Sequence, residues 1–168
     1  TVKNNSNQDA KLKAMNLIAE SAGAEGMVRG QVIDLESEGI KVEKETLEYM
    51  HRCKTGALIK APILSSALIC GASEEQYRKL LEYAESIGLA FQIKDDIMDV
   101  KGSLEEMGKS AGKDAASNKT TYVTLYGVDE AEVLLGKVIK NALASLESFG
   151  EKADFLREMA LYIKNRNN

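Results

Sequence analysis

The stretch that most constrains this chain is Phe91–Asp99, which carries three aspartates within a long apolar segment. On a helix, Asp95 and Asp99 are four residues apart and Asp96 and Asp99 three apart, so the carboxylates stack on one face. The neighbouring residues are almost all apolar, which predicts a helix that is buried on most sides. Carboxylates on a buried helix have to be paired or bound to a metal. We therefore expect the aspartates to line an interior cavity.

Several close carboxylates repel one another unless a cation sits between them. Hard oxygen ligands of this kind suit Mg²⁺, which takes one or two carboxylates, several waters and substrate phosphates. The pattern therefore indicates a phosphate or diphosphate group held by magnesium on a helical wall. The simpler alternative is an acidic, solvated helix face.

The composition predicts an all-α helical bundle. The chain has 168 residues, 44% of them hydrophobic, and a single proline. Alanine, leucine, glutamate and lysine are abundant, and these residues favour helix. The length corresponds to one domain. Ser73 with Gln76 forms a capping box that begins the helix carrying the aspartates, and we expect Gly102 to end it.

Further helical segments surround this one. A helix running from about Lys44 to Cys70 contains Lys54-Thr55-Gly56 and Pro62, which predict a bend that frees carbonyl oxygens. Apolar residues at helical spacing predict the others, which are a helix from Asp9, a helix from Met27 to Glu38, a helix capped by Asp129 with Glu132, and a last helix through Ile163.

Charge and hydropathy exclude some classes of function. The net charge is −4, which gives no argument for a nucleic-acid partner. No apolar run is long enough to span a membrane, so we expect no stable membrane anchor. The two cysteines, Cys53 and Cys70, lack metal-ligand spacing, and we interpret them as reduced in a cytoplasmic protein. His51 is the only histidine, and we interpret it as structural.

Residues 103–119 are rich in glycine, serine, lysine and glutamate and predict a long loop. Its lysines follow directly after the aspartates. Lysines as point charges suit diphosphate oxygens, so the loop is either a diphosphate-binding loop or a solvated connection.

The segment Gly88–Val100 resembles the second aspartate-rich motif of the trans-polyprenyl diphosphate synthases, the farnesyl and geranylgeranyl diphosphate synthases. The resemblance extends over nearly the whole chain, with other motifs in the family's order. These are Met27-Val28-x-Gly30-Gln31 with Asp34-Leu35-Glu36, His51-Arg52-x-Lys54-Thr55-Gly56, Gly108-Lys109 and Asn118-Lys119.

The resemblance implies an isoprenoid synthase fold and a role for each matching residue. Gln31 would face the cavity near the diphosphates, and Phe91 would contact substrate. Thr55 and Gln92 would stabilise an allylic cation, and the basic tail at Arg166 would reach isopentenyl diphosphate. Magnesium would be held by Asp95, Asp96 and Asp99 with support from Asp114, and the allylic diphosphate would be held by Lys54, Lys109 and Lys119.

The family's first aspartate-rich motif is missing, since Asp95-Asp96 is the only Asp-Asp pair in the chain. We therefore expect residues 1–168 to be the C-terminal portion of one isoprenoid synthase domain, inactive alone. By resemblance, the complete enzyme would be a homodimer that condenses isopentenyl diphosphate with an allylic diphosphate. Two alternatives remain open. One is a non-catalytic helical subunit or diphosphate-binding module that pairs with a catalytic partner, and the other is a helical interaction domain with an acidic face.

Overall fold

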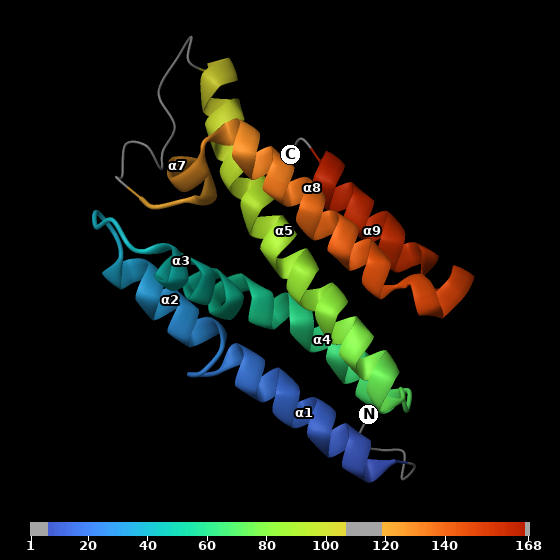
Figure 1. The fold of residues 1–168 in the computed structure, drawn as a ribbon. Coiled ribbons are helices and arrows are strands. Elements are labelled where there is room, and N and C mark those ends of the chain that lie inside the picture. Colours follow the sequence, from blue (N-terminus) through green and yellow to red (C-terminus); the bar gives the residue numbers. More distant parts are fainter. Residues whose placement is uncertain (1–6, 107–118, 167–168) are drawn as a thin grey trace.

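The computed structural model describes residues 7–106 and 119–166, which are helical and contain no strand (Figure 1). The elements in chain order are α1 (Gln8–Ala22), α2 (Met27–Glu36), α3 (Lys44–His51), the π-helical turn η1 (Arg52–Gly56), α4 (Ala57–Ile69), α5 (Glu74–Glu106), α7 (Tyr122–Tyr126), α8 (Val128–Ser145), the 3₁₀ helix η2 (Glu147–Ala153) and α9 (Asp154–Asn165). The predicted all-α bundle is confirmed.

Helix α5 is the central element of the bundle. On one side it packs against η1 and α4, which are covered in turn by α1 and α2, and on the other side against α8 and α9 (Figure 1). The apolar residues of α5 that make these contacts are almost fully buried, as the sequence predicted. They include Ala84, Ile87, Ala90, Ile93 and Ile97. Among the described helices, none combines the length and apolarity needed to cross a membrane.

The start of α5 was predicted correctly and its end was not. The Gln76 side chain accepts a hydrogen bond from the Ser73 backbone N–H at 2.9 Å, and the Gln76 N–H donates to Ser73 Oγ at 3.2 Å. Gly102 does not end the helix, which continues to Glu106. An interior glycine costs only about 1 kcal/mol relative to alanine, so it weakens a helix without necessarily stopping it.

The predicted cap of α8 was also wrong. The helix begins at Val128, directly after Gly127, whose φ is +80°. Asp129 therefore lies inside the first turn, where its charge complements the helix dipole rather than capping the end. The short helix α7 carries a capping box instead, in which the Thr121 side chain accepts from the Thr124 N–H at 3.1 Å.

The predicted irregularity between α3 and α4 is the π-helical turn η1, which contains Lys54-Thr55-Gly56. Two glycines allow neighbouring helices to approach this turn closely. A Cβ on Gly30 of α2 would lie 2.2 Å from the Lys54 backbone nitrogen, and a Cβ on Gly88 of α5 would lie 3.1 Å from Gly56 Cα. The turn is therefore held between α2 and α5, and this contact fixes the positions of Lys54 and Thr55.

Candidate functional site

Asp34 is the centre of a charged cluster between α2, η1 and the segment before α7. Its carboxylate meets Lys54 Nζ at 2.6 Å and Lys119 Nζ at 2.9 Å, and only 9% of its side chain is exposed. Burial acts to raise the pKa of Asp34, but the hydrogen bonds from the two lysines outweigh burial and lower it. Asp34 is therefore a fixed anion that holds two ammonium groups together.

Both lysines were predicted as diphosphate ligands, and the structure brings them together. About a third of each lysine side chain is exposed. An ammonium group has three donors, so a lysine that is bonded to Asp34 can still donate to a phosphate oxygen. The Thr120 hydroxyl accepts a hydrogen bond from the Val42 N–H at 3.0 Å, which fixes the segment next to Lys119 against the start of α3.

Sequence reasoning did not assign Asp34 this role. Its partners are 20 and 85 positions away in the chain, and its short spacing to Gln31 suggested only a helix face. One signal was present, because Asp34 falls in the segment next to the quoted Gly30-Gln31 motif. Gln31 itself is half-buried on the same helix.

Asp95 lies on α5 and is paired with Arg166 at the C-terminal end of α9. Arg166 donates to the Asp95 carboxylate and to the Phe91 carbonyl, the latter at 3.2 Å, and its guanidinium lies 4.0 Å from the centre of the Phe91 ring. Burial raises the pKa of Asp95, and Arg166 offsets this only in part. Arg166 is thus a closer neighbour of the aspartates than its place in a terminal tail suggested.

Asp96 points in a different direction. Its carboxylate accepts a hydrogen bond from the Tyr122 N–H at 2.7 Å and so anchors the start of α7 on α5. Asp99 lies one turn further along α5 and is half-buried. Within the described ranges, no group of three or more His, Cys, Asp or Glu side chains is arranged as a metal site.

The donor set still fits a partial magnesium shell. Magnesium takes one or two carboxylates and completes its shell with water and phosphate oxygens. The Asp95 side chain is 42% exposed, and a single arginine does not fully compensate its charge. Such a carboxylate can accept a second cation. Lys109 and Asp114, the remaining predicted ligands, lie outside the described residues.

An apolar groove of about 610 Å³ lies beside these charges, between α4, α5 and α9. We call it the α9 groove. Lys54, Thr55 and Arg166 line its polar end, and Phe91 lies next to them. Its walls are almost entirely apolar, formed by Leu58, Ile59, Pro62, Ile63, Tyr83, Ile87, Phe155, Leu156, Met159, Tyr162 and Ile163. The groove thus joins a long apolar channel to a cationic end.

His51 is buried, in keeping with the structural interpretation. Its ring stacks on Tyr122, with 5.7 Å between ring centres. Burial lowers the pKa of His51 to about 4, so the imidazole is neutral at neutral pH. Gln92, a predicted catalytic residue, lies close enough to act on this pKa. Gln92 is therefore next to His51 and does not line the α9 groove.

A family model described as polyprenyl synthetase matches residues 2–159. The chain is 42% identical to a geranylgeranyl diphosphate synthase of Cyanophora paradoxa, over 95% of this chain and 54% of that protein. It is 37% identical to a farnesyl diphosphate synthase of Micrococcus luteus, over 96% of this chain and 55% of that protein.

Solved structures agree with these relatives. An FPP/GFPP synthase from Zymomonas mobilis superposes with a TM-score of 0.79 at 31% identity, over 94% of this chain and 52% of that one. A geranyltransferase from Helicobacter pylori, solved with magnesium and isoprenyl diphosphate, gives a TM-score of 0.73 at 27% identity, with the same coverage of both chains. The chain spans about half the length of the curated relatives it matches.

Proposed function

The chain belongs to the polyprenyl synthetase family, and from that premise we propose that it forms the C-terminal portion of a prenyltransferase. The complete enzyme would condense isopentenyl diphosphate with an allylic diphosphate and release pyrophosphate. Residues 1–168 would then be part of a single isoprenoid synthase domain, inactive without the half that carries the first aspartate-rich motif.

One observation carries this proposal. Lys54 takes part in the Asp34 cluster and also lines the polar end of the α9 groove. A diphosphate bound at that end would meet ammonium groups, while an apolar chain attached to it would extend along the groove. A prenyl diphosphate has this combination of a concentrated negative charge and a long apolar body.

The roles of the residues follow from their positions. Asp95, Asp96 and Asp99, with Asp114, would hold magnesium, which neutralises diphosphate charge and assists departure of the leaving group when bound. Lys54 and Lys119 would hold the diphosphate while Asp34 keeps both ammonium groups in place, and Lys109 would add a third positive charge. Gln31, on the same helix as Asp34, would line the diphosphate side.

The allylic cation would be stabilised by dipoles. Thr55 lines the polar end of the α9 groove, where its hydroxyl and the carbonyls of η1 can face developing positive charge. Phe91 would pack against substrate, since its ring borders the same end. Gln92 lies on the His51 side of α5, so a role at the cation would require its amide to reach around the helix.

We also propose that the complete enzyme is a homodimer, that it is cytoplasmic, and that it has no nucleic-acid partner. Some relatives are described as chloroplastic. The alternative is a diphosphate-binding subunit that pairs with a separate catalytic chain. Both possibilities need the same diphosphate site.

Thermal denaturation of the chain with magnesium and pyrophosphate tests this site. Ligand that binds only the native state stabilises it by about 2.7 kcal/mol at 100 times Kd, so Tm should rise. Lys54→Gln should reduce the rise, whereas Lys140→Gln, exposed on α8 and outside the Asp34 cluster, should retain it. No rise in the unsubstituted chain would contradict the proposal.

Activity separates an enzyme half from a binding subunit. In a protein restored to full length with the N-terminal half of a relative, synthesis of prenyl diphosphate is expected, and Asp95→Ala should abolish it. Turnover that survives Asp95→Ala would reject the assigned role of Asp95. Pyrophosphate binding without turnover in the restored protein would favour the binding subunit.

A further inference from the structure

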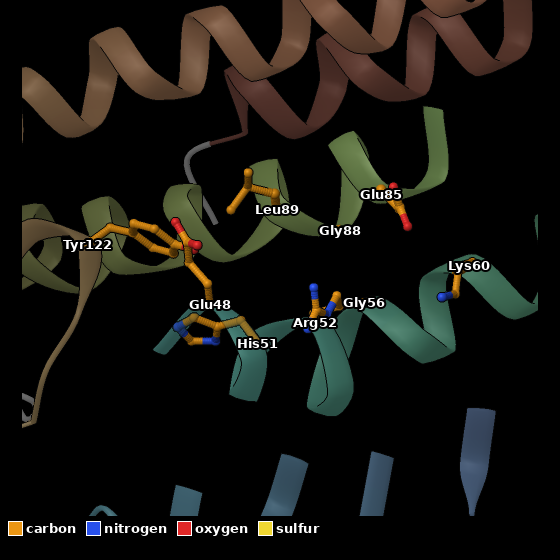
Figure 2. Close-up of a pocket in the computed structure, with 9 residues that line it drawn as sticks. All are labelled: Glu48, His51, Arg52, Gly56, Lys60, Glu85, Gly88, Leu89 and Tyr122. Carbon is orange, nitrogen blue, oxygen red and sulfur yellow. The ribbon is translucent and has the colours of Figure 1, made fainter. Parts of the chain in front are cut away.

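A second cavity, which we call the His51 cavity, lies between α3, η1, α4, α5 and α7 (Figure 2). It uses Glu85, Gly88 and Leu89 of α5, whereas the α9 groove uses Tyr83, Ile87 and Phe91 of the same helix. The two cavities therefore open on different faces of α5. The volume of the His51 cavity is about 260 Å³, close to the lower end of the ~300–1,000 Å³ that is usual for ligand pockets.

Buried polar atoms without partners line its inner end. Tyr122 is 1% exposed and His51 is 9% exposed. The Tyr122 hydroxyl makes no hydrogen bond within the described residues. Neither imidazole nitrogen of His51 makes a hydrogen bond of good geometry there, although the Gln92 side chain lies within hydrogen-bonding reach of the ring and raises its pKa. Buried polar atoms in native proteins are almost always bonded to protein, water or ligand. The Tyr122 hydroxyl, together with the one His51 nitrogen that Gln92 leaves open, therefore indicates an occupant.

The inner end is suited to an uncharged hydroxyl group. His51 is neutral, so one ring nitrogen donates and the other accepts. The buried Tyr122 hydroxyl has no partner within the described residues, and a phenol can both donate and accept a hydrogen bond. Figure 2 shows Tyr122 reaching from α7 toward Glu48 and His51. A carboxylate here would meet Glu48, whereas a hydroxyl can both donate and accept.

The walls and the outer end have different chemistry. Gly56 and Gly88 pack directly against each other, since a Cβ on Gly88 would lie 3.1 Å from Gly56 Cα, so together they form a wall without side chains. Leu89 adds an apolar surface beside this wall, on which a compact apolar body can lie. Arg52 and Lys60 line the cavity on the η1 and α4 side, with Glu85 on α5. The guanidinium carbon of Arg52 lies 5.2 Å from the centre of the Tyr49 ring. Among the salt bridges of the described residues, none involves Arg52 or Lys60. These two cations are available to an anionic group.

We propose that the His51 cavity binds a small hydroxylated organic anion. Its hydroxyl bonds to Tyr122 and His51, its apolar body lies on Leu89 and the two glycines, and its anionic group faces Arg52 and Lys60. The cavity shares no lining residue with the α9 groove, although Asp34, Lys54 and Lys119 lie close enough to influence the His51 pKa. It exists whether or not the chain takes part in prenyl transfer.

Isothermal titration calorimetry of the chain with three probes tests the proposal. The first is 4-hydroxyphenylacetate, which carries both polar groups; phenylacetate lacks the hydroxyl, and 4-methylphenol lacks the carboxylate. We expect saturable one-site binding of the first probe and about tenfold weaker binding of the other two, the size of one lost hydrogen bond. No saturable binding, or equal binding of phenylacetate, overturns the proposal and leaves water as the occupant.

Variants of the protein locate the binding. Tyr122→Phe removes one hydroxyl and should weaken 4-hydroxyphenylacetate about tenfold while leaving phenylacetate unchanged. Tyr77→Phe, outside this cavity on α5, should change neither affinity. Because the buried Tyr122 supports α7, the exposed Arg52 provides a second test: Arg52→Gln should weaken both carboxylates and leave 4-methylphenol unchanged. Unchanged affinities in both Tyr122→Phe and Arg52→Gln overturn the assignment.

Discussion

Asp34 and Asp95 are two carboxylates that face cations from different helices, and their pKa values move in opposite directions. The Asp34 side chain is only 9% exposed, yet its pKa is lowered, because two lysines outweigh its burial. The Asp95 side chain is 42% exposed, yet its pKa is raised, because burial outweighs a single arginine. The number of nearby cations, rather than exposure, decides whether each charge is compensated.

The difference assigns the two carboxylates different tasks. Asp34 is saturated with positive charge, and its function is to hold Lys54 and Lys119. Asp95 faces a single arginine, so a further cation would lower the free energy of its charged form. This is why we propose it as a magnesium ligand. The same sequence feature, an aspartate on a helix, thus faces two cations in one place and one cation in the other.

The variant with the largest expected effect is Gly30→Ala, which would push α2 away from η1 and so separate Asp34 from Lys54. Gly30→Ala would place a Cβ 2.2 Å from the Lys54 backbone nitrogen. Because the obstacle is backbone and cannot rotate away, we expect unfolding free energy to fall by more than about 3 kcal/mol in urea denaturation, at the upper end of overpacking effects.

Gly136→Ala is the matched control for this variant. Gly136 lies inside α8, and nothing lies within 4 Å of its added Cβ. Alanine there should raise the stability by up to about 1 kcal/mol through helix propensity. Equal losses of unfolding free energy in Gly30→Ala and Gly136→Ala would show that the close α2–η1 contact does not limit the side chain at position 30.

The pKa of His51 tests the Asp34 half of the comparison, because Asp34 and its two lysines all influence this pKa. Its pKa of about 4 results mainly from burial, with smaller effects from Lys119, Asp34 and Lys54. Since the value is below the ordinary 6.5, the unfolded chain binds a proton that the folded chain cannot. Stability should therefore decrease as the pH falls from about 6.5 to about 4, by up to about 3 kcal/mol, and then cease to depend on His51.

Urea unfolding at about pH 7.5 and about pH 4.5 measures this loss. His51→Gln stays neutral at both values, so the variant should lose less stability than the parent over the same interval. Carboxylate titration affects both proteins equally and cancels in the difference. A parent and variant with the same pH dependence would show that the imidazole titrates normally.

Substitution of Asp34 and of Asp95 compares how much each carboxylate contributes to stability. We expect Asp34→Asn to cost about 1–3 kcal/mol near neutral pH, because two charge-assisted hydrogen bonds lose their anion. Asp95→Asn should cost less, since loss of the Arg166 pair is offset by relief of a carboxylate whose charged form is disfavoured by partial burial. Denaturation of both variants beside the parent gives the comparison.

The pH dependence of these two variants has opposite signs. The lowered pKa of Asp34 means that its contribution is present above the ordinary value of 3.8 and is lost as the pH falls through the lower folded value. The raised pKa of Asp95 means that its charge destabilises the fold at neutral pH, and this penalty disappears as the pH falls. An equal cost for both variants at neutral pH would contradict the difference in compensation.

Local patterns gave most of the fold. The Ser73–Gln76 capping box, the apolar period of α5 and the Lys54-Thr55-Gly56 irregularity were all readable, because each depends on residues within a few positions of one another. Helix ends were less reliable. Gly102 lies within α5 and Asp129 within α8, since neither a single glycine nor a single acidic residue determines a boundary against the packing of the whole helix.

The site was only partly readable, because its key contacts join distant segments. The lysines were identified from their motifs, but their common partner Asp34 follows only from the packing of α2 against η1. Likewise, three aspartates at helix spacing suggested one acidic face, yet Asp95 pairs with α9 and Asp96 with α7. Consecutive residues on a helix point about 100° apart, so their partners depend on tertiary structure.

The smallest expected effect concerns the partner of Asp95. If Arg166 and magnesium compete for this carboxylate, Arg166→Gln should increase the rise in Tm that magnesium and pyrophosphate produce, by an amount worth about 0.3–1 kcal/mol, as expected for one partly exposed ion pair. Lys164→Gln, in the same turn of α9 and exposed, should leave the rise unchanged. A smaller rise in Arg166→Gln would mean that the arginine itself binds pyrophosphate. Asp95 would then position Arg166 and would not serve as a magnesium ligand.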